Sequence, residues 1–153
     1  MKPRTVKLQE ETDRIINKCD VGYLAMVDSS NSPYVIPMNF GLDGDKIYFH
    51  TARKGKKVEI LMKNNRVSIS FSTDHSMYIK NESVACSYTM KYRSVIVHGT
   101  AEFIENFDCK IYGMNVIMKH YTGKEFSYNK PAIDNVCVFR VNVEEFEARV
   151  YGY

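Results

Sequence analysis

The 153-residue sequence contains no tryptophan and only four prolines and four cysteines. The cysteines, Cys19, Cys86, Cys109 and Cys137, are far apart, with no C-x-x-C pair and no histidine at the spacing of a zinc site. This pattern indicates neither a disulfide framework nor a metal centre, and it is typical of free thiols. No apolar run approaches the ~20 residues that a membrane-spanning helix requires.

The sequence also lacks a strong net charge and an apolar leader. It begins with charged residues, so we expect a cytoplasmic protein. A formal charge of +3 is too small to predict a nucleic-acid or membrane surface over the whole molecule. Positive charge is instead concentrated between Arg53 and Arg66, where Glu59 is the only acid. The length predicts one domain, residues 1–153, with a substantial hydrophobic core.

The basic segment has an unusual local context. An apolar strand ends near Thr51, and Val58, Leu61 and Met62 then follow at helical spacing, which predicts a short helix from about residue 55 to 64. Lys56 and Lys57 fall in its first turn, where the partial positive charge of the helix disfavours cations. A bound phosphate would relieve this conflict by accepting hydrogen bonds from free N–H groups, a hydroxyl and two ammonium groups.

Hydrophobic periodicity predicts a mainly β protein with few helices. Helices are expected at 9–18 and 107–121, the second ending at Gly123, and strands at 23–27, 34–40, 46–51, 66–71, 92–104 and 136–143. Residues 41–45 are predicted as a turn, residues 73–90 as a long connection without clear periodicity, and Gly99 as a bend or bulge. Six strands in adjacent hairpins favour an antiparallel sheet, and closure into a small barrel would remove its edges.

Three segments together resemble the FMN-binding split barrels related to pyridoxamine 5′-phosphate oxidase, particularly the nitroimidazole-resistance branch. They are GYLA with PYVIPMNF (residues 22–25 and 33–40), IYFHTA with GKK (47–52 and 55–57), and YRSVIVHGTAE (92–102). The resemblance implies a six-stranded antiparallel split β-barrel with flanking helices. It also implies a homodimer with two FMN molecules in clefts between the subunits.

The resemblance assigns a phosphate-binding role to three residues. Lys56 and Lys57 match the basic pair on the FMN phosphate, and Thr51 matches the adjacent hydroxyl. The competing interpretation is a solvated basic loop, which is what most runs of charge are. Many relatives carry arginine where this sequence has Lys56, so a point charge would replace a bidentate contact.

Other residues match the ring end of the cofactor site. Pro37, Met38 and Asn39 correspond to the strand whose backbone runs along the isoalloxazine ring, and Ser94 to a polar residue near the flavin. Pro37 is equally compatible with an ordinary edge strand. His50 occupies the position before the threonine, where the resistance branch typically has histidine, and it is the candidate proton donor. A structural, hydrogen-bonded histidine is the alternative.

The sequence departs from the true vitamin oxidases, because it has no tryptophan and ends in Val150–Tyr153. The leading hypothesis is therefore an FMN-dependent oxidoreductase that reduces a small planar acceptor, with nitroimidazoles and other nitroaromatics as candidates, using a nicotinamide or similar donor. The alternative is a binding module that stores, senses or sequesters flavin or haem, with His50 or His98 as a haem ligand. Nucleic-acid binding is not predicted, because stacking aromatics do not interrupt the basic run.

Overall fold

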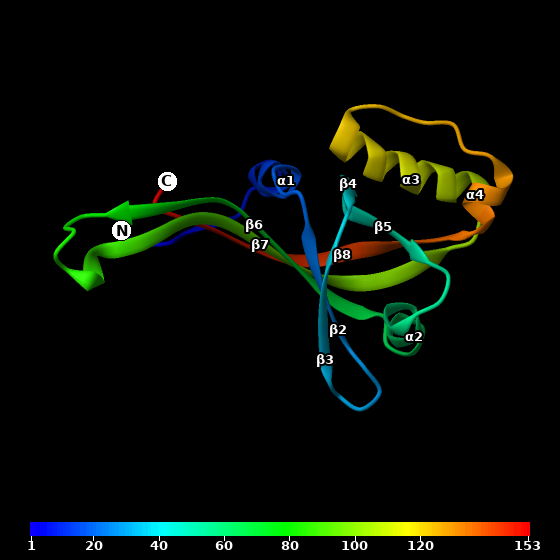
Figure 1. Cartoon of the computed structure of the whole chain (residues 1–153), viewed down its shortest axis with the longest axis horizontal. Helices are drawn as coiled ribbons and strands as arrows, with labels where there is room; N and C mark the ends of the chain where they lie inside the picture. The colour runs from blue at the N-terminus through cyan, green and yellow to red at the C-terminus, as the bar shows by residue number, and fades with distance from the viewer.

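The computed structural model describes residues 1–153, which form one antiparallel sheet of eight strands with four α-helices (Figure 1). The strands are β1 (Arg4–Val6), β2 (Gly22–Val27), β3 (Pro33–Met38), β4 (Gly41–Asp43), β5 (Lys46–Ala52), β6 (Arg66–Ile79), β7 (Tyr88–Ile104) and β8 (Val136–Tyr151). The helices are α1 (Gln9–Asn17), α2 (Lys56–Lys63), α3 (Phe107–Thr122) and α4 (Lys130–Asp134), with a 3₁₀ turn at Ala85–Ser87.

The strands follow the order β3-β2-β6-β7-β8-β5-β4, and β1 pairs with β8. Because β3 and β4 lie at opposite ends of this order, the sheet stays open between them, and the barrel is split. This confirms the predicted mainly β, antiparallel architecture. The closure that would have removed the sheet edges is not present. No helix combines the length with the hydropathy that spanning a membrane requires.

All six predicted strands are present, but the strand count is wrong by two. The short strands β1 and β4 were not expected, and β4 begins inside the predicted turn at residues 41–45. The last strand continues to Tyr151 instead of ending at residue 143. Three-residue strands such as β4 are too short to show an alternating pattern, and they form here because a longer neighbour, β5, supplies the pairing partner.

The prediction of a connection at residues 73–90 is also wrong. β6 continues to Ile79 and β7 starts at Tyr88, so these residues form most of a long hairpin. The hairpin is bulged between Thr73 and Ser76. Its side chains are largely exposed on both sides, which removes the apolar and polar alternation that identifies a half-buried strand.

The main core lies inside the curled sheet, where alternate residues point inward. Val67, Ile69 and Phe71 of β6 are buried, whereas Ser68 and Ser70 face outward. The stacked rings of Phe49 and Phe139 join β5 to β8 in this core, with centroids 5.2 Å apart. α1 and α2 contribute further buried side chains, namely Ile15, Ile16, Ile60 and Leu61.

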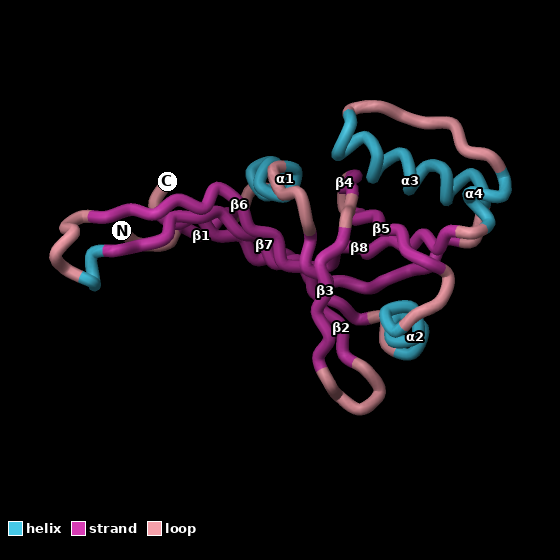
Figure 2. Tube along the Cα trace, in the orientation of Figure 1, coloured by secondary structure: helices cyan, strands magenta, loops and turns pink.

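A second, smaller cluster lies between the sheet and α3, and includes Tyr48, Val138 and Ile117. α3 begins where the side chain of Asn106 accepts a hydrogen bond from the Cys109 N–H group, and it ends at Gly123 as predicted, with φ of 70°. Figure 2 shows α3 and α4 at one end of the molecule and the long β6–β7 hairpin projecting from the other. The candidate site lies beside the helical end, where β5 leads into α2.

Candidate functional site

The turn between β5 and α2 places two lysines at a helix start, as predicted. α2 begins at Lys56, and Gly55 before it has φ of 138° and no side chain that could cap the helix. The first N–H group with an intrahelical acceptor is that of Glu59, which donates to the Gly55 carbonyl. The preceding N–H groups therefore point out of the helix without intrahelical acceptors.

Lys57 folds back onto the end of β5. Its Nζ atom lies 3.0 Å from the Thr51 hydroxyl oxygen, to which it donates a hydrogen bond. The structure thus brings together the hydroxyl and one of the two ammonium groups that the sequence assigned to a phosphate. This pair provides two donors on one side of the helix start.

Lys56 points toward β3. Its Nζ atom lies 4.4 Å from the centre of the Tyr34 ring, close enough for a cation–π interaction. Tyr34 was not among the predicted site residues, and no sequence pattern could identify it, because the contact joins elements that are more than twenty residues apart. The contact links the basic helix start to the edge strand that was predicted to contact the flavin ring.

The basic turn has no acidic partner. None of the ion pairs in the structure involves Arg53, Lys54, Lys56 or Lys57, and Arg53 instead donates a 2.7 Å hydrogen bond to the Asp134 carbonyl. A Cβ atom added at Gly55 would meet no atom within 4 Å, so the turn is open to a ligand. Open N–H groups, two ammonium groups and a hydroxyl suit the phosphate of a mononucleotide.

The predicted ring-binding residues lie at the edge of the sheet. β3 is the first strand in the order, which confirms that Pro37 belongs to an edge strand. The side chain of Met38 is buried in the core, whereas those of Pro37 and Asn39 are exposed. Any contact of Met38 with a ligand would therefore use its backbone.

His50 lies half-buried on β5, where it pairs with Val138 of β8. Side chains alternate along a strand, so His50 and Thr51 project from opposite faces, and a ligand touching both must span the end of β5. Burial lowers the pKa of His50 below its usual value of 6.5, and the positive charge of Lys57 lowers the pKa further. At pH 7 the ring is consequently mostly neutral.

The electrostatic influence of Lys57 on His50 can be measured. Replacing Lys57→Met should raise the pKa of His50, because the nearby positive charge that disfavours the imidazolium is removed. An NMR titration of the imidazole ring protons reports the change. The matched variant Lys63→Met, at the other end of α2, should leave the titration unchanged. Equal shifts in the two variants would contradict a specific effect of Lys57.

Ser94 lies far from His50 along the sheet within one chain. It lies on β7 ten residues before Ile104, and Ile104 shares a cross-strand row with Val138 and His50. At ~3.3 Å per residue, Ser94 is roughly 33 Å along the strand from that row. Ser94 lies closer to the edge strand, because Ile96, two residues further along β7, shares a cross-strand row with Ser70, Tyr23 and Pro37.

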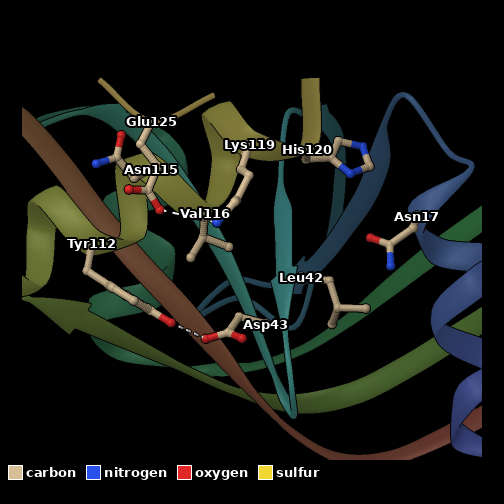
Figure 3. Close-up of a pocket in the computed structure, with 9 residues that line it drawn as sticks. All are labelled: Asn17, Leu42, Asp43, Tyr112, Asn115, Val116, Lys119, His120 and Glu125. Carbon is tan, nitrogen blue, oxygen red and sulfur yellow. Dashed lines mark hydrogen bonds and ion pairs between the residues drawn. The ribbon is translucent and has the colours of Figure 1, made fainter. Parts of the chain in front are cut away.

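Another hollow lies between α1, β4 and α3, with a volume of about 290 Å³ (Figure 3). Its lining consists of Asn17, Leu42, Asp43, Tyr112, Asn115, Val116, Lys119, His120 and Glu125. Its polar groups are largely paired with one another: Tyr112 donates to Asp43, which raises the pKa of Tyr112 to about 12, and Lys119 pairs with Glu125. None of the predicted site residues lines this hollow. Because most of its polar side chains are already paired, few of them are free to bind a ligand.

The open antiparallel barrel, with a basic helix start beside its edge strand, defines a protein of the split-barrel class. The chain belongs to the pyridoxamine 5′-phosphate oxidase family, whose model matches residues 9–150. This family membership confirms the resemblance drawn from the three sequence segments. No match to the sequence was found among curated proteins.

Solved structures extend this comparison. A candidate 5-nitroimidazole antibiotic resistance protein from Bacteroides thetaiotaomicron is 36% identical, with a TM-score of 0.87 over 97% of this chain and 87% of that protein. The flavocytochrome Anf3 from Azotobacter vinelandii is 18% identical, with a TM-score of 0.82 over 97% and 70%. An FAD- and haem-binding protein from Mycobacterium smegmatis is 16% identical, with a TM-score of 0.84 over 100% and 75%. The last two similarities concern the fold alone.

Proposed function

We propose that the protein is an FMN-binding oxidoreductase that reduces a small planar acceptor, with nitroaromatic compounds as the first candidates. The observation that carries this proposal is the helix start whose lysines form no ion pair with an acid of the chain: Lys57 contacts Thr51, and Lys56 contacts the Tyr34 ring of the edge strand. The 36% identity to a candidate 5-nitroimidazole resistance protein supports the choice of acceptor. A nicotinamide or similar compound is the proposed electron donor.

In this proposal the phosphate lies at the start of α2, and the ring lies along the exposed edge of β3. The lysine pair supplies charge, and Thr51 together with the free N–H groups supplies directed hydrogen bonds. The bound flavin supplies hydride or single-electron transfer. The backbone of residues 37–39 positions the ring, and the protonated form of His50, a minority at pH 7, delivers the proton to the acceptor.

We further propose a homodimer with the cofactor at the subunit interface. One cross-strand row on the outer face of the sheet joins Pro37, Tyr23, Ser70 and Ile96, all of them exposed. The side chain of Tyr23 is 49% exposed and that of Ile96 is 38% exposed. A two-fold partner on this face would cover the row and could carry its own Ser94 toward the basic turn of the first subunit.

Purification of the protein tests the cofactor. We expect a yellow protein whose heat-released ligand is FMN by chromatography, with one FMN per chain. Release of FAD would keep the flavin proposal and change the cofactor. A protein that neither carries flavin nor binds added FMN would refute the proposal.

The role of His50 is tested by steady-state reduction of a nitroimidazole. The variant His50→Ala should lower kcat by about 10²-fold, the usual contribution of a positioned proton donor, with FMN retained. The wild-type rate should rise as the pH falls toward the lowered pKa of His50, and the variant should lose this rise. His75→Ala, an exposed histidine bonded to Ser72, is the control and should keep wild-type activity.

A haem-binding module remains the competing hypothesis for this fold. The structure gives His98 little freedom to ligate iron, because Nδ1 lies 2.8 Å from the Ser68 hydroxyl oxygen and Nε2 lies 3.2 Å from the Glu147 carboxylate. The absorption spectrum separates the two hypotheses. A Soret band in place of the flavin bands would favour haem.

A further inference from the structure

The hairpin beyond the body of the sheet, residues 74–91, is called the arm below. It consists of the end of β6, the 3₁₀ turn at Ala85–Ser87 and the start of β7. Figures 1 and 2 show the arm projecting from the molecule at the end opposite α3 and α4. A ribbon of only two strands is marginally stable in water unless other parts of a protein pack against it.

The inner side of the arm is held at its base by the C-terminus of the same chain. The Tyr153 ring lies 4.3 Å from Lys91 Nζ and 4.0 Å from Arg93 Cζ, and its hydroxyl donates a 2.6 Å hydrogen bond to the Asp74 carbonyl. The Asp74 carboxylate also pairs with Arg93 and Lys18. These contacts fix the direction in which the arm leaves the sheet.

The outer side of the arm is apolar and uncovered. Met77 pairs with Met90 across the ribbon, and Ile79 pairs with Tyr88, so that alternation places all four side chains on one side. Their exposed fractions are 54% for Met77, 44% for Met90, 42% for Ile79 and 45% for Tyr88. The patch contains no charged side chain, which favours a protein partner over a nucleic acid or an anionic lipid surface.

The patch is continuous with the outer face of the sheet. Alternate residues of β7 share one side, and Tyr88 and Met90 therefore lie on the same side as Ser94 and Ile96. Ile96 belongs to the exposed row that was proposed above as the subunit interface. The apolar surface of the arm thus extends that row along β7 beyond the body of the molecule.

We infer that the arm clasps a second copy of this chain, with Met77, Ile79, Tyr88 and Met90 buried against the partner. The inference rests on the proposed homodimer and names the surface that stabilises it. A stable interface buries about 800 Å² on each partner, more than four half-exposed side chains can supply. The arm and the outer row together form one continuous surface that can approach this size, and a two-fold axis uses it on both copies.

Matched double variants test the clasp by analytical ultracentrifugation. Met77→Lys/Met90→Lys places two charges on the outer side, and we expect it to raise the dimer dissociation constant at least about 30-fold, as for residues at the centre of an interface. Tyr78→Lys/Thr89→Lys alters the adjacent cross-strand pair on the inner side, and the constant should change less than about threefold. Equal effects of the two variants, or a monomeric wild type, would overturn the inference.

Methionine oxidation tests burial in the unmodified protein. Met62 is 74% exposed on α2 and serves as the internal reference. Met77 and Met90 are less exposed than Met62 even within one chain, so their oxidation rates relative to Met62 are compared between the wild type and the variant Ile79→Lys. In the wild-type dimer this relative rate should be clearly lower than in the variant, because the partner covers both methionines. Equal relative rates in the two proteins would show that the arm is uncovered.

Flavin content, measured on the same samples, separates this inference from the proposed function. A dimer that depends on the arm but binds no flavin would refute the function and leave the clasp intact. A flavin-loaded protein with a monomeric mass or an unprotected arm would refute the clasp and leave the function intact. Thermal unfolding of both double variants identifies any loss of dimer that is caused by misfolding.

Discussion

The double variant Lys56→Ala/Lys57→Ala is expected to lose FMN during purification and to bind added FMN at least about 100-fold more weakly, because each charge-assisted hydrogen bond contributes roughly 1.5–3 kcal/mol. Lys57 contacts Thr51 directly, and neither lysine is neutralised by an acid of the chain. Glu59, the one acid in the first turn of α2, forms no ion pair with either lysine, so a phosphate would be the only anion in contact with them. Fluorescence titration with FMN measures the affinity.

The control for this prediction removes the same charge elsewhere. Lys119→Ala/Lys124→Ala alters the end of α3 and the loop that follows it, which Figure 1 shows across the sheet from α2. This variant should bind FMN as the wild type does. In the Lys56→Ala/Lys57→Ala variant, the repulsion between the two ammonium groups and the positive end of α2 is removed. The thermal stability of this variant without FMN should therefore not fall. Retention of FMN by the Lys56/Lys57 variant would place the phosphate elsewhere.

Local sequence patterns predicted most of the fold. The spacing of Val58 and Leu61 identified α2, and the alternation of Val67, Ile69 and Phe71 identified the first half of β6, because in both cases one face is buried. The helix end at Gly123 and the bulge at Gly99 were both predicted correctly, the first because glycine permits a positive φ and the second because a glycine inside a strand often marks a bulge. The arm was missed because burial, which creates periodicity, is absent from its residues within one chain.

The candidate site was predictable in part, for a similar reason. Lys56, Lys57 and Thr51 lie close in sequence and in one strand–turn–helix unit, so the pattern that named them also placed them together. Tyr34 reaches Lys56 through tertiary packing that no local pattern encodes. Ser94 was named by resemblance alone, and the proposed homodimer is the arrangement that would bring it close to the basic turn.

Gly99→Ala is expected to destabilise the fold by more than about 3 kcal/mol, at the upper end of the cost of overpacking. Gly99 follows the register shift between β7 and β8, the pair at the centre of the sheet. A Cβ atom there would lie 2.1 Å from the Asn142 carbonyl oxygen, closer than real Cβ contacts allow. The Asn142 carbonyl oxygen is a backbone atom, so the overlap can be relieved only if β8 moves away from β7.

The matched substitution Gly123→Ala separates steric overlap from backbone strain. Gly123 has φ of 70°, and an added Cβ atom would meet nothing within 4 Å, so the only cost is the left-handed conformation, about 1–2 kcal/mol. Urea unfolding followed by circular dichroism should give a clearly lower midpoint for Gly99→Ala than for Gly123→Ala. Similar midpoints would show that the β7–β8 bulge can open at little cost. The arm would then also lack a rigid base, because β7 continues from the bulge into the arm.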